Sequence, residues 1–112
     1  MITVTFDQFR CLMDFDTEGK FCNEVAFSVK GSEKFSFCWM GKMPDEKTKK
    51  DVFWFGLTED GKNEFDYHTF GEFSSAKVFD GKSLLDLLDD VIILEIDGCD
   101  PMERILHYIG EE

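Results

Sequence analysis

The sequence predicts an α+β fold, with a mainly antiparallel sheet of four to six strands and two or three short helices. Two observations support this class. Several short segments alternate apolar and polar residues and are separated by glycine-containing turns, as in antiparallel sheets. Helical spacing of apolar residues is clearest in the C-terminal third, where we expect the two best-defined helices. Because the chain has 112 residues and 43% of them are hydrophobic, we expect residues 1–112 to form a single domain.

The N-terminal segment is compatible with two kinds of element. Residues 3–6 suit a short first strand, whereas the apolar residues that follow lie at near-helical spacing. Those apolar residues are Phe6, Phe9, Leu12 and Met13. Whether residues 7–14 form a helix or a strand therefore stays open at this point.

Residues 21–30 and 34–40 alternate clearly and predict a hairpin with a glycine-containing turn. The apolar residues are Val25, Phe27 and Val29 in the first strand and Phe35, Phe37 and Trp39 in the second. The apolar faces of a hairpin lie together, and all of these residue numbers are odd. The numbers of opposing residues should therefore sum to an even value, so that Phe27 faces Phe35 or Phe37.

Further strands are predicted in the middle of the chain and near its end. A charged loop over residues 40–51 leads to a third strand at 52–57, which is apolar on both faces. Residues 64–70 alternate again and predict a fourth strand, and residues 76–79 offer a short fifth one. Residues 92–96 are rich in residues that favour strands and add another.

Two helices are predicted in the C-terminal third. Ser83 can cap the first of them, with Asp86 at its third position. The apolar stripe of this helix is formed by Leu84, Leu87, Leu88 and Val91. The second helix begins at Asp100, a capping residue followed by Pro101 and by Glu103 in the first turn. Its apolar face is formed by Ile105, Leu106 and Ile109, before a stop at Gly110.

The charge of the chain excludes several classes of partner. Acidic residues outnumber basic residues by 24 to 12, which gives a formal net charge of −12. Residues 80–112 contain ten of the acidic residues and only two of the basic ones, so the anionic field is concentrated there. Such a charge repels phosphate backbones and anionic lipid surfaces. We therefore expect neither direct nucleic-acid binding nor membrane binding.

The N-terminus and the cysteines indicate a cytoplasmic protein. No basic region precedes Asp7, and no hydrophobic region of signal-peptide length can form before it. No apolar run approaches the roughly 18 residues of a membrane span. The four cysteines, which fall in no Cys-x-x-Cys pair, are Cys11, Cys22, Cys38 and Cys99. We expect them to be reduced, unlinked and free of zinc.

Two segments resemble parts of ligand-binding motifs but lack a required residue. Residues 14–19 resemble the start of an EF-hand calcium loop, yet the twelfth position is Val25 where the motif needs a bidentate Glu. Residues 80–83 resemble the end of a phosphate-binding loop. The glycine required five residues before Gly81 is, however, Ala76. We therefore expect turns at both places, with no metal and no cofactor.

Candidate catalytic residues are few. His68 and His107 are the only side chains that shuttle protons near neutral pH without a perturbed pKa. Neither belongs to a recognisable catalytic constellation, and Ser74 and Ser75 lack the flanking signature of an activated nucleophile. We expect a binding protein rather than an enzyme. A small enzyme that uses either histidine with nearby carboxylates is the weaker alternative.

An acidic surface in the C-terminal third is the first candidate binding site. Within the predicted helix, Asp86 repels Asp89 and Asp90 at i+3 and i+4, which costs a few tenths of a kcal/mol per pair. Helix stability alone would not favour these residues, but charged surface runs usually serve only solubility, and that interpretation stays open. The candidate partner-binding residues are Asp86, Asp89, Asp90, Glu95, Asp97 and Asp100.

The strand at 52–57 is the second candidate, because it is apolar on both faces. A few short helices cover one face of a sheet more easily than two. Either this strand lies at the centre of a sheet covered on both sides, or it presents aromatic side chains for dimerisation or partner binding. The aromatic candidates are Phe53, Trp54 and Phe55.

In size and charge the chain resembles the compact acidic proteins of phages and mobile elements that block nucleic-acid-binding enzymes, anti-CRISPR proteins among them. This likeness implies an inhibitor that occupies a basic, nucleic-acid-binding surface of a partner protein. Our leading hypothesis is accordingly a small acidic protein-binding module that mimics nucleic acid. The alternative is an immunity or antitoxin-like protein that binds a toxin through an aromatic sheet face, and a homodimer formed through that face also stays open.

Overall fold

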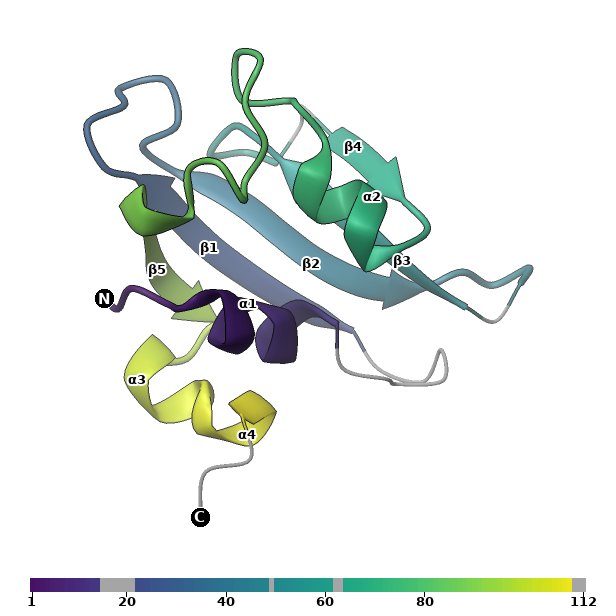
Figure 1. Ribbon diagram of the computed structural model, residues 1–112. Coiled ribbons are helices and arrows are strands. Elements are labelled where there is room, and N and C mark those ends of the chain that lie inside the picture. Colours follow the sequence, from purple (N-terminus) through teal and green to yellow (C-terminus); the bar gives the residue numbers. More distant parts are fainter. Residues whose placement is uncertain (15–21, 49, 62–63, 110–112) are drawn as a thin grey trace.

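Five strands form one antiparallel sheet in the order β4-β3-β2-β1-β5 (Figure 1). The computed structural model describes residues 1–14, 22–48, 50–61 and 64–109. The strands are β1 (Asn23–Val29), β2 (Cys38–Pro44), β3 (Asp51–Gly56), β4 (Glu64–Tyr67) and β5 (Val91–Ile96). The helices are α1 (Phe6–Met13), α2 (Phe70–Ser75), the 3-10 helix η1 (Leu88–Asp90), α3 (Pro101–Arg104) and α4 (Leu106–Ile109). The predicted α+β class with a mainly antiparallel sheet is confirmed.

The core lies between the helices and one face of the sheet. Figure 1 shows α1 and α2 in front of the same face, with α3 and α4 beyond the end of β5. On α1 the side chains of Phe9, Leu12 and Met13 are fully buried. The amide of Asn23 donates a hydrogen bond of 2.9 Å to the carbonyl of Leu12, which ties the end of α1 to β1. None of the described helices covers the opposite face of the sheet.

Phenylalanine rings occupy the centre of this core. Phe55 of β3 stacks on Phe73 of α2, with ring centroids 4.2 Å apart and ring planes 16° apart. Phe79 meets Phe55 edge-on at 5.4 Å and Phe35 at 5.1 Å. Phe9 of α1 lies 6.2 Å from Phe73. Because such pairs contribute beyond the area they bury, α1, α2 and two loops are anchored at one point of the sheet.

The predicted register between the first two strands is wrong. Phe27 pairs with Cys38 and Val25 pairs with Met40, so opposing residue numbers sum to an odd value. β2 also begins at Cys38 rather than at residue 34, and it continues to Pro44 through the segment that we expected to be a charged loop. The side chains of β2 that face the core are therefore the even-numbered ones.

The physical reason lies in Phe35 and Lys42. Phe35 is buried from the loop before β2, where it packs on Phe79, so its burial does not require a strand. Lys42 turns inward and is only 1% exposed, and its ammonium group lies 3.6 Å from a carboxylate oxygen of Asp51. A buried lysine needs such a partner, and the pairing across β2 and β3 supplies it.

Capping residues decide where α1 and α2 begin. The Thr5 N–H donates to Oε1 of Gln8 at 2.9 Å, and the Gln8 N–H donates to Oγ1 of Thr5 at 3.2 Å. This capping box accompanies a helix in the segment that the sequence left open. Thr69 Oγ1 accepts the N–H of Glu72 at 3.1 Å, and α2 follows. The fourth strand, β4, therefore ends at Tyr67, before the end of the predicted range 64–70.

A tight turn replaces the short strand predicted at residues 76–79. Phe79 and Lys82 exchange two backbone hydrogen bonds of 3.0 and 3.2 Å. Between them Asp80 and Gly81 have φ values of 54° and 87°. Two central residues with positive φ are typical of a two-residue hairpin turn, so this segment reverses the chain instead of joining the sheet.

The helix predicted from Ser83 is also wrong. The expected cap is present, since the Ser83 N–H lies 2.9 Å from Oδ2 of Asp86 and the Asp86 N–H lies 3.2 Å from Oγ of Ser83. The following N–H groups nevertheless donate to carbonyls three residues earlier, which produces turns and η1 rather than an α-helix. These groups belong to Leu87, Leu88 and Asp90. Val91, the last residue of the predicted stripe, already starts β5.

The C-terminal helix begins as predicted. Asp100 caps α3 by accepting the N–H of Met102 at 2.8 Å, and Pro101 occupies the first helical position. Ile105 is buried between α3 and α4. The predicted stop at Gly110 lies outside the described residues.

Asp97 connects these helices to β1. Its Oδ1 accepts the N–H of Glu24 at 3.0 Å, and its backbone N–H donates to the Glu24 carbonyl at 2.7 Å. Its Oδ2 accepts hydrogen bonds from Nε of Arg104, at 3.0 Å, and from the hydroxyl of Tyr108. Burial, together with this bond, raises the pKa of Tyr108. One carboxylate thus holds β1, α3 and α4 together.

We expect Asp97→Asn to lower the free energy of unfolding by about 1–2 kcal/mol, since the variant loses charged hydrogen bonds at a partly exposed site. Asn tolerates the positive φ of 54° at this position, so backbone strain is not added. Urea denaturation measures the change. The matched control is Asp100→Ser, which removes the same charge but keeps a capping side chain and should stay within a few tenths of a kcal/mol of the parent. Equal stabilities of Asp97→Asn and the parent would contradict this role.

Candidate functional site

The face of the sheet opposite to the helices carries two tryptophans between small and acidic residues. Directly paired residues share a face, so the register defines rows that cross the sheet. The first row is Asp66, Trp54, Gly41 and Glu24, across β4, β3, β2 and β1. The second row is Glu64, Gly56, Trp39, Ala26 and Glu95, and it ends on β5. We call these nine residues the open face.

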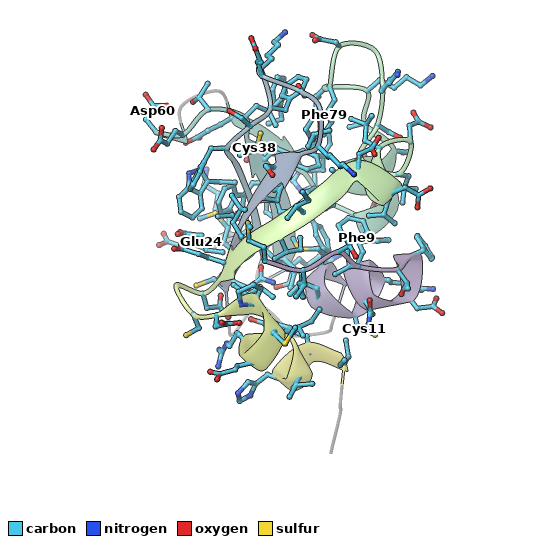
Figure 2. All side chains as sticks on the ribbon, turned by 90° about the vertical axis from the view of Figure 1, so that its left-hand side faces the viewer. Phe9, Cys11, Glu24, Cys38, Asp60 and Phe79 are labelled. Carbon is cyan, nitrogen blue, oxygen red and sulfur yellow. The ribbon has the colours of Figure 1, made fainter. Side chains whose placement is uncertain are left out.

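The figures agree with this assignment. In Figure 2, Glu24 and Asp60 lie on one side of the sheet and Phe9 of α1 lies on the other. Asp60 belongs to the loop between β3 and β4, which borders the open face. The open face and the aromatic core are therefore on opposite sides of one sheet.

Glycine makes room for the first tryptophan. A Cβ atom on Gly41 would lie 2.6 Å from Cζ2 of Trp54 and 2.3 Å from the carbonyl oxygen of Asn23. Both distances are far below van der Waals contact, so the indole ring of Trp54 occupies the space over Gly41. Trp54 remains partly exposed.

The second tryptophan is held by its neighbours. Trp39 lies between Gly56 and Ala26 in its row, and Ala26 is fully buried although none of the described helices covers this face. The indole N–H of Trp39 donates to the carbonyl oxygen of Glu59 at 2.8 Å. The ring of Phe37 meets it edge-on at 5.4 Å. Trp39 is thus fixed in place, and it is also partly exposed.

Two hollows meet at Trp54. The larger has a volume of about 480 Å³ and is lined by residues that include Trp54, Met43, Glu64 and Asp66. The smaller has a volume of about 330 Å³ and extends toward Trp39 and the loop between β3 and β4. Glu24, Trp54 and Glu64 line both. The open face is therefore a concave surface with an aromatic floor.

A carboxylate stands at each end of both rows. Adjacent strands lie about 4.8 Å apart, so the ends of a row are on the order of 14–19 Å apart and the tryptophans lie between them. All four carboxylates belong to exposed residues, and neither row contains a basic residue. Within the part of the chain that the structure describes, none of the four makes an ion pair. They are Glu24, Glu64, Asp66 and Glu95.

Of the three predicted aromatic candidates, one reaches the open face. Phe53 and Phe55 point into the core and are 5% and 0% exposed. Trp54 points the opposite way, because it lies between them on the same strand. Of the two interpretations of this strand, burial in the core therefore fits Phe53 and Phe55. An exposed aromatic surface fits Trp54, and Trp39 lies on the same face.

The six predicted acidic candidates do not form one surface. Asp86, Asp89 and Asp90 precede β5, whereas Asp97 and Asp100 follow it. The strand between the two groups has six residues and is about 20 Å long. Glu95 lies on β5 itself and belongs to the open face.

Three of these acidic residues have partners within the chain. Asp97 accepts the hydrogen bonds described above, and Asp100 caps α3. Asp86 accepts the backbone N–H of Ser83, and this hydrogen bond is the main reason why its pKa is lowered. Asp89 and Asp90 are exposed.

Neither of the two histidines is buried, and no metal-ligating cluster occurs among the described residues. His68 follows β4 and His107 lies on α4, and both are exposed. Among residues 1–14, 22–48, 50–61 and 64–109, no three His, Cys, Asp or Glu side chains are placed to hold a metal ion. Residues 15–19 of the EF-hand-like segment lie outside the described residues.

The sequence did not assign four charged or aromatic residues of the open face to a site: Trp39, Glu24, Glu64 and Asp66. A local signal was present for the last two, because Glu64 and Asp66 alternate with Phe65 and Tyr67 along β4. Alternation alone shows that two acids share a face. Only the pairing of β4 with β3 puts that face beside Trp54.

Comparison of the chain with protein-family models, with curated proteins and with solved structures found no match. The described helices are all too short or too polar to cross a lipid bilayer.

Asp86 should make a pH-dependent contribution to stability. Its pKa is lowered in the folded chain, so its contribution is present above the usual range of an Asp carboxyl and disappears as the pH falls through the lowered value. We expect the melting temperature of Asp86→Asn to lie below that of the parent at neutral pH. The difference in melting temperature should vanish under acidic conditions. Thermal melts across this pH range provide the measurement, with Asp89→Asn as a control. A difference that does not change with pH would show that the charge of Asp86 does not matter.

The cysteines should differ in reactivity. Cys11, Cys22 and Cys99 are exposed and unlinked, whereas Cys38 is fully buried and burial raises its pKa to about 11. The thiolate is the reactive form, so titration of the native protein with a thiol reagent should find three fast groups. The fourth should react only on unfolding, and Cys38→Ala should remove this slow phase. Fewer than four thiols in the unfolded, unreduced protein would reveal a disulfide instead.

Proposed function

We propose that this protein is a binding module whose open face binds a basic surface of a partner protein. The proposal rests on the order of residues in each row. A tryptophan lies beside small residues, and a carboxylate stands at each end. Tryptophan is favoured at the energetic centres of protein interfaces, whereas charged residues are depleted at those centres and the surrounding rim is polar. The open face has this arrangement.

Folding stability gives no reason for the charges of the open face. Four carboxylates on one surface repel one another, and they gain no salt bridge within the described residues. A cationic partner would relieve this repulsion on binding. Complementary charge would also speed the encounter, an effect that salt screens within about 8 Å at physiological ionic strength.

The same argument makes a second copy of the chain a poor occupant of this face. A two-fold symmetric dimer would place the same patch on both sides of the interface. The carboxylates of one open face would then lie against those of the other. A basic heterologous partner is favoured over a homodimer.

The finer proposal is that the basic surface is one that normally binds nucleic acid. Carboxylates at the ends of the rows would take the place of phosphates, and the tryptophans would take the place of stacked bases. The likeness in size and charge to anti-CRISPR proteins supports this inhibitor role. An immunity or antitoxin-like protein that binds a basic toxin is the alternative, and the partly exposed Trp39 and Trp54 favour it equally.

Two variants with the same change of charge test the proposal. One carries Glu24→Gln, Glu64→Gln and Asp66→Asn on the open face. The other carries Asp86→Asn, Asp89→Asn and Asp90→Asn before β5. A partner first captured from the native host is purified, and its binding kinetics are measured at two salt concentrations.

We expect the open-face variant to weaken binding at least tenfold, mainly through slower association, and the other variant to change it less than threefold. Added salt should slow association of the parent more than it speeds dissociation. Competition by duplex DNA or RNA for the partner would support the inhibitor role. Loss of binding only in the variant at residues 86–90 would contradict the open face as the site and restore the acidic surface first expected from the sequence.

A further inference from the structure

The larger hollow has the features of a site for one flat cation. Its floor includes the indole of Trp54, which lies over Gly41 and is partly exposed. Asp66 pairs directly with Trp54 across β3 and β4, and Glu64 stands on the same face two residues away. A group that stacks on the indole would therefore lie beside two carboxylates.

Nothing within the described chain satisfies these groups. The carboxylates of Glu64 and Asp66 have no ion-pair partner among the described residues, and the indole N–H of Trp54 makes no hydrogen bond there, unlike that of Trp39. Among the described residues that line the hollow, the lysine is Lys42, but its side chain is 1% exposed and its ammonium group pairs with Asp51 on the core side. No residue in the described part of the chain therefore places a positive charge beside these two carboxylates.

The lining of the hollow favours a guanidinium group over an ammonium group. A guanidinium group is planar, stacks on an indole ring and presents several N–H donors in its plane, which suits carboxylates at the edge of the ring. An ammonium group is compact and strongly hydrated, and it gains less from one flat aromatic surface. A cage for a methylated ammonium group would need several aromatic walls. Trp54 is the one aromatic residue that lines this hollow among the described residues.

We propose that the hollow binds the guanidinium group of an arginine side chain that projects from the basic surface of the partner protein. The indole of Trp54 stacks on the guanidinium plane, Asp66 and Glu64 accept its N–H groups, and Glu24 contributes charge from the other end of the row. This inference rests on the proposed function, because it names the chemical group that the open face recognises.

A short peptide tests the proposal without the partner. The probe is a capped pentapeptide with one arginine between glycines, and its counterparts carry lysine or citrulline at the same position. Each is titrated into the 15N-labelled chain, and the indole and backbone amide resonances are followed by NMR. We expect saturable shifts at Trp54 and on β4, with the arginine peptide binding at least fivefold more tightly than the lysine peptide and no binding of citrulline.

Two variants locate the site. Trp54→Leu should weaken binding of the arginine peptide at least tenfold. The variant with Glu64→Gln and Asp66→Asn should do the same without altering the aromatic floor, so the test stands even if Trp54→Leu folds poorly. The control with Asp89→Asn and Asp90→Asn removes two charges elsewhere and should change the affinity less than twofold.

The outcomes separate this inference from the proposed function. Equal binding of the arginine and lysine peptides would overturn guanidinium recognition, and so would shifts that centre away from Trp54. Absence of any peptide binding, while the partner still loses affinity for the open-face variant, would overturn the arginine site but leave the proposed function standing. If the partner also ignores the open-face variant, both fail.

Discussion

The pairing of Phe27 with Cys38 determines which side chains lie on each face of the sheet. Because side chains alternate along a strand, a shift of this register by one residue would exchange the two faces of β2 relative to β1. The observed register turns Met40 and Lys42 toward the helices and Trp39 away from them. The pairing of β2 with β3 then places Trp54 over Gly41 on the same side as Trp39. The open face is a direct consequence of one hairpin register.

The second constraint is that the described helices cover one face of the sheet. They are short, and the rings around Phe55 come from α2, where Phe73 stacks on it, and from the turn after α2, where Phe79 meets it edge-on. This concentration of large rings fills the core on the helical side. On the other side the two tryptophans cover the strands themselves, and Ala26 is fully buried there although none of the described helices lies above it. The tryptophans therefore contribute to stability as well as to the proposed interface, which explains why only part of each ring is exposed.

Local patterns predicted much of the fold, because strands and caps depend on neighbouring residues. The strands at β1, β3 and β5 and the start of α3 at Asp100 follow from alternation and from capping. The register of β2 did not, because Phe35 has the same apolar character in a loop as in a strand. The cap at Ser83 formed without a helix. The Leu85 N–H donates to the carbonyl of Ser74, and the chain enters β5 at Val91. These outcomes depend on contacts distant in sequence.

The proposed binding surface was harder to predict, because the net charge of a segment does not show which of its carboxylates the chain itself uses as hydrogen-bond acceptors. The C-terminal third is the most acidic part of the sequence, yet several of its carboxylates accept hydrogen bonds from the chain itself. Asp97, which the charge pattern assigned to partner binding, instead holds both backbone groups of Glu24.

Glu24 is one end of the first row of the open face, so Asp97 positions a residue of the proposed site without belonging to it. An acidic residue in this chain can thus either stabilise the fold or be available to another protein. The hydrogen bonds that its carboxylate accepts from the chain distinguish the two roles. The carboxylates beside Trp54 make no ion pair with any described residue, which is why we place the proposed site on the sheet and not in the segment with the highest charge.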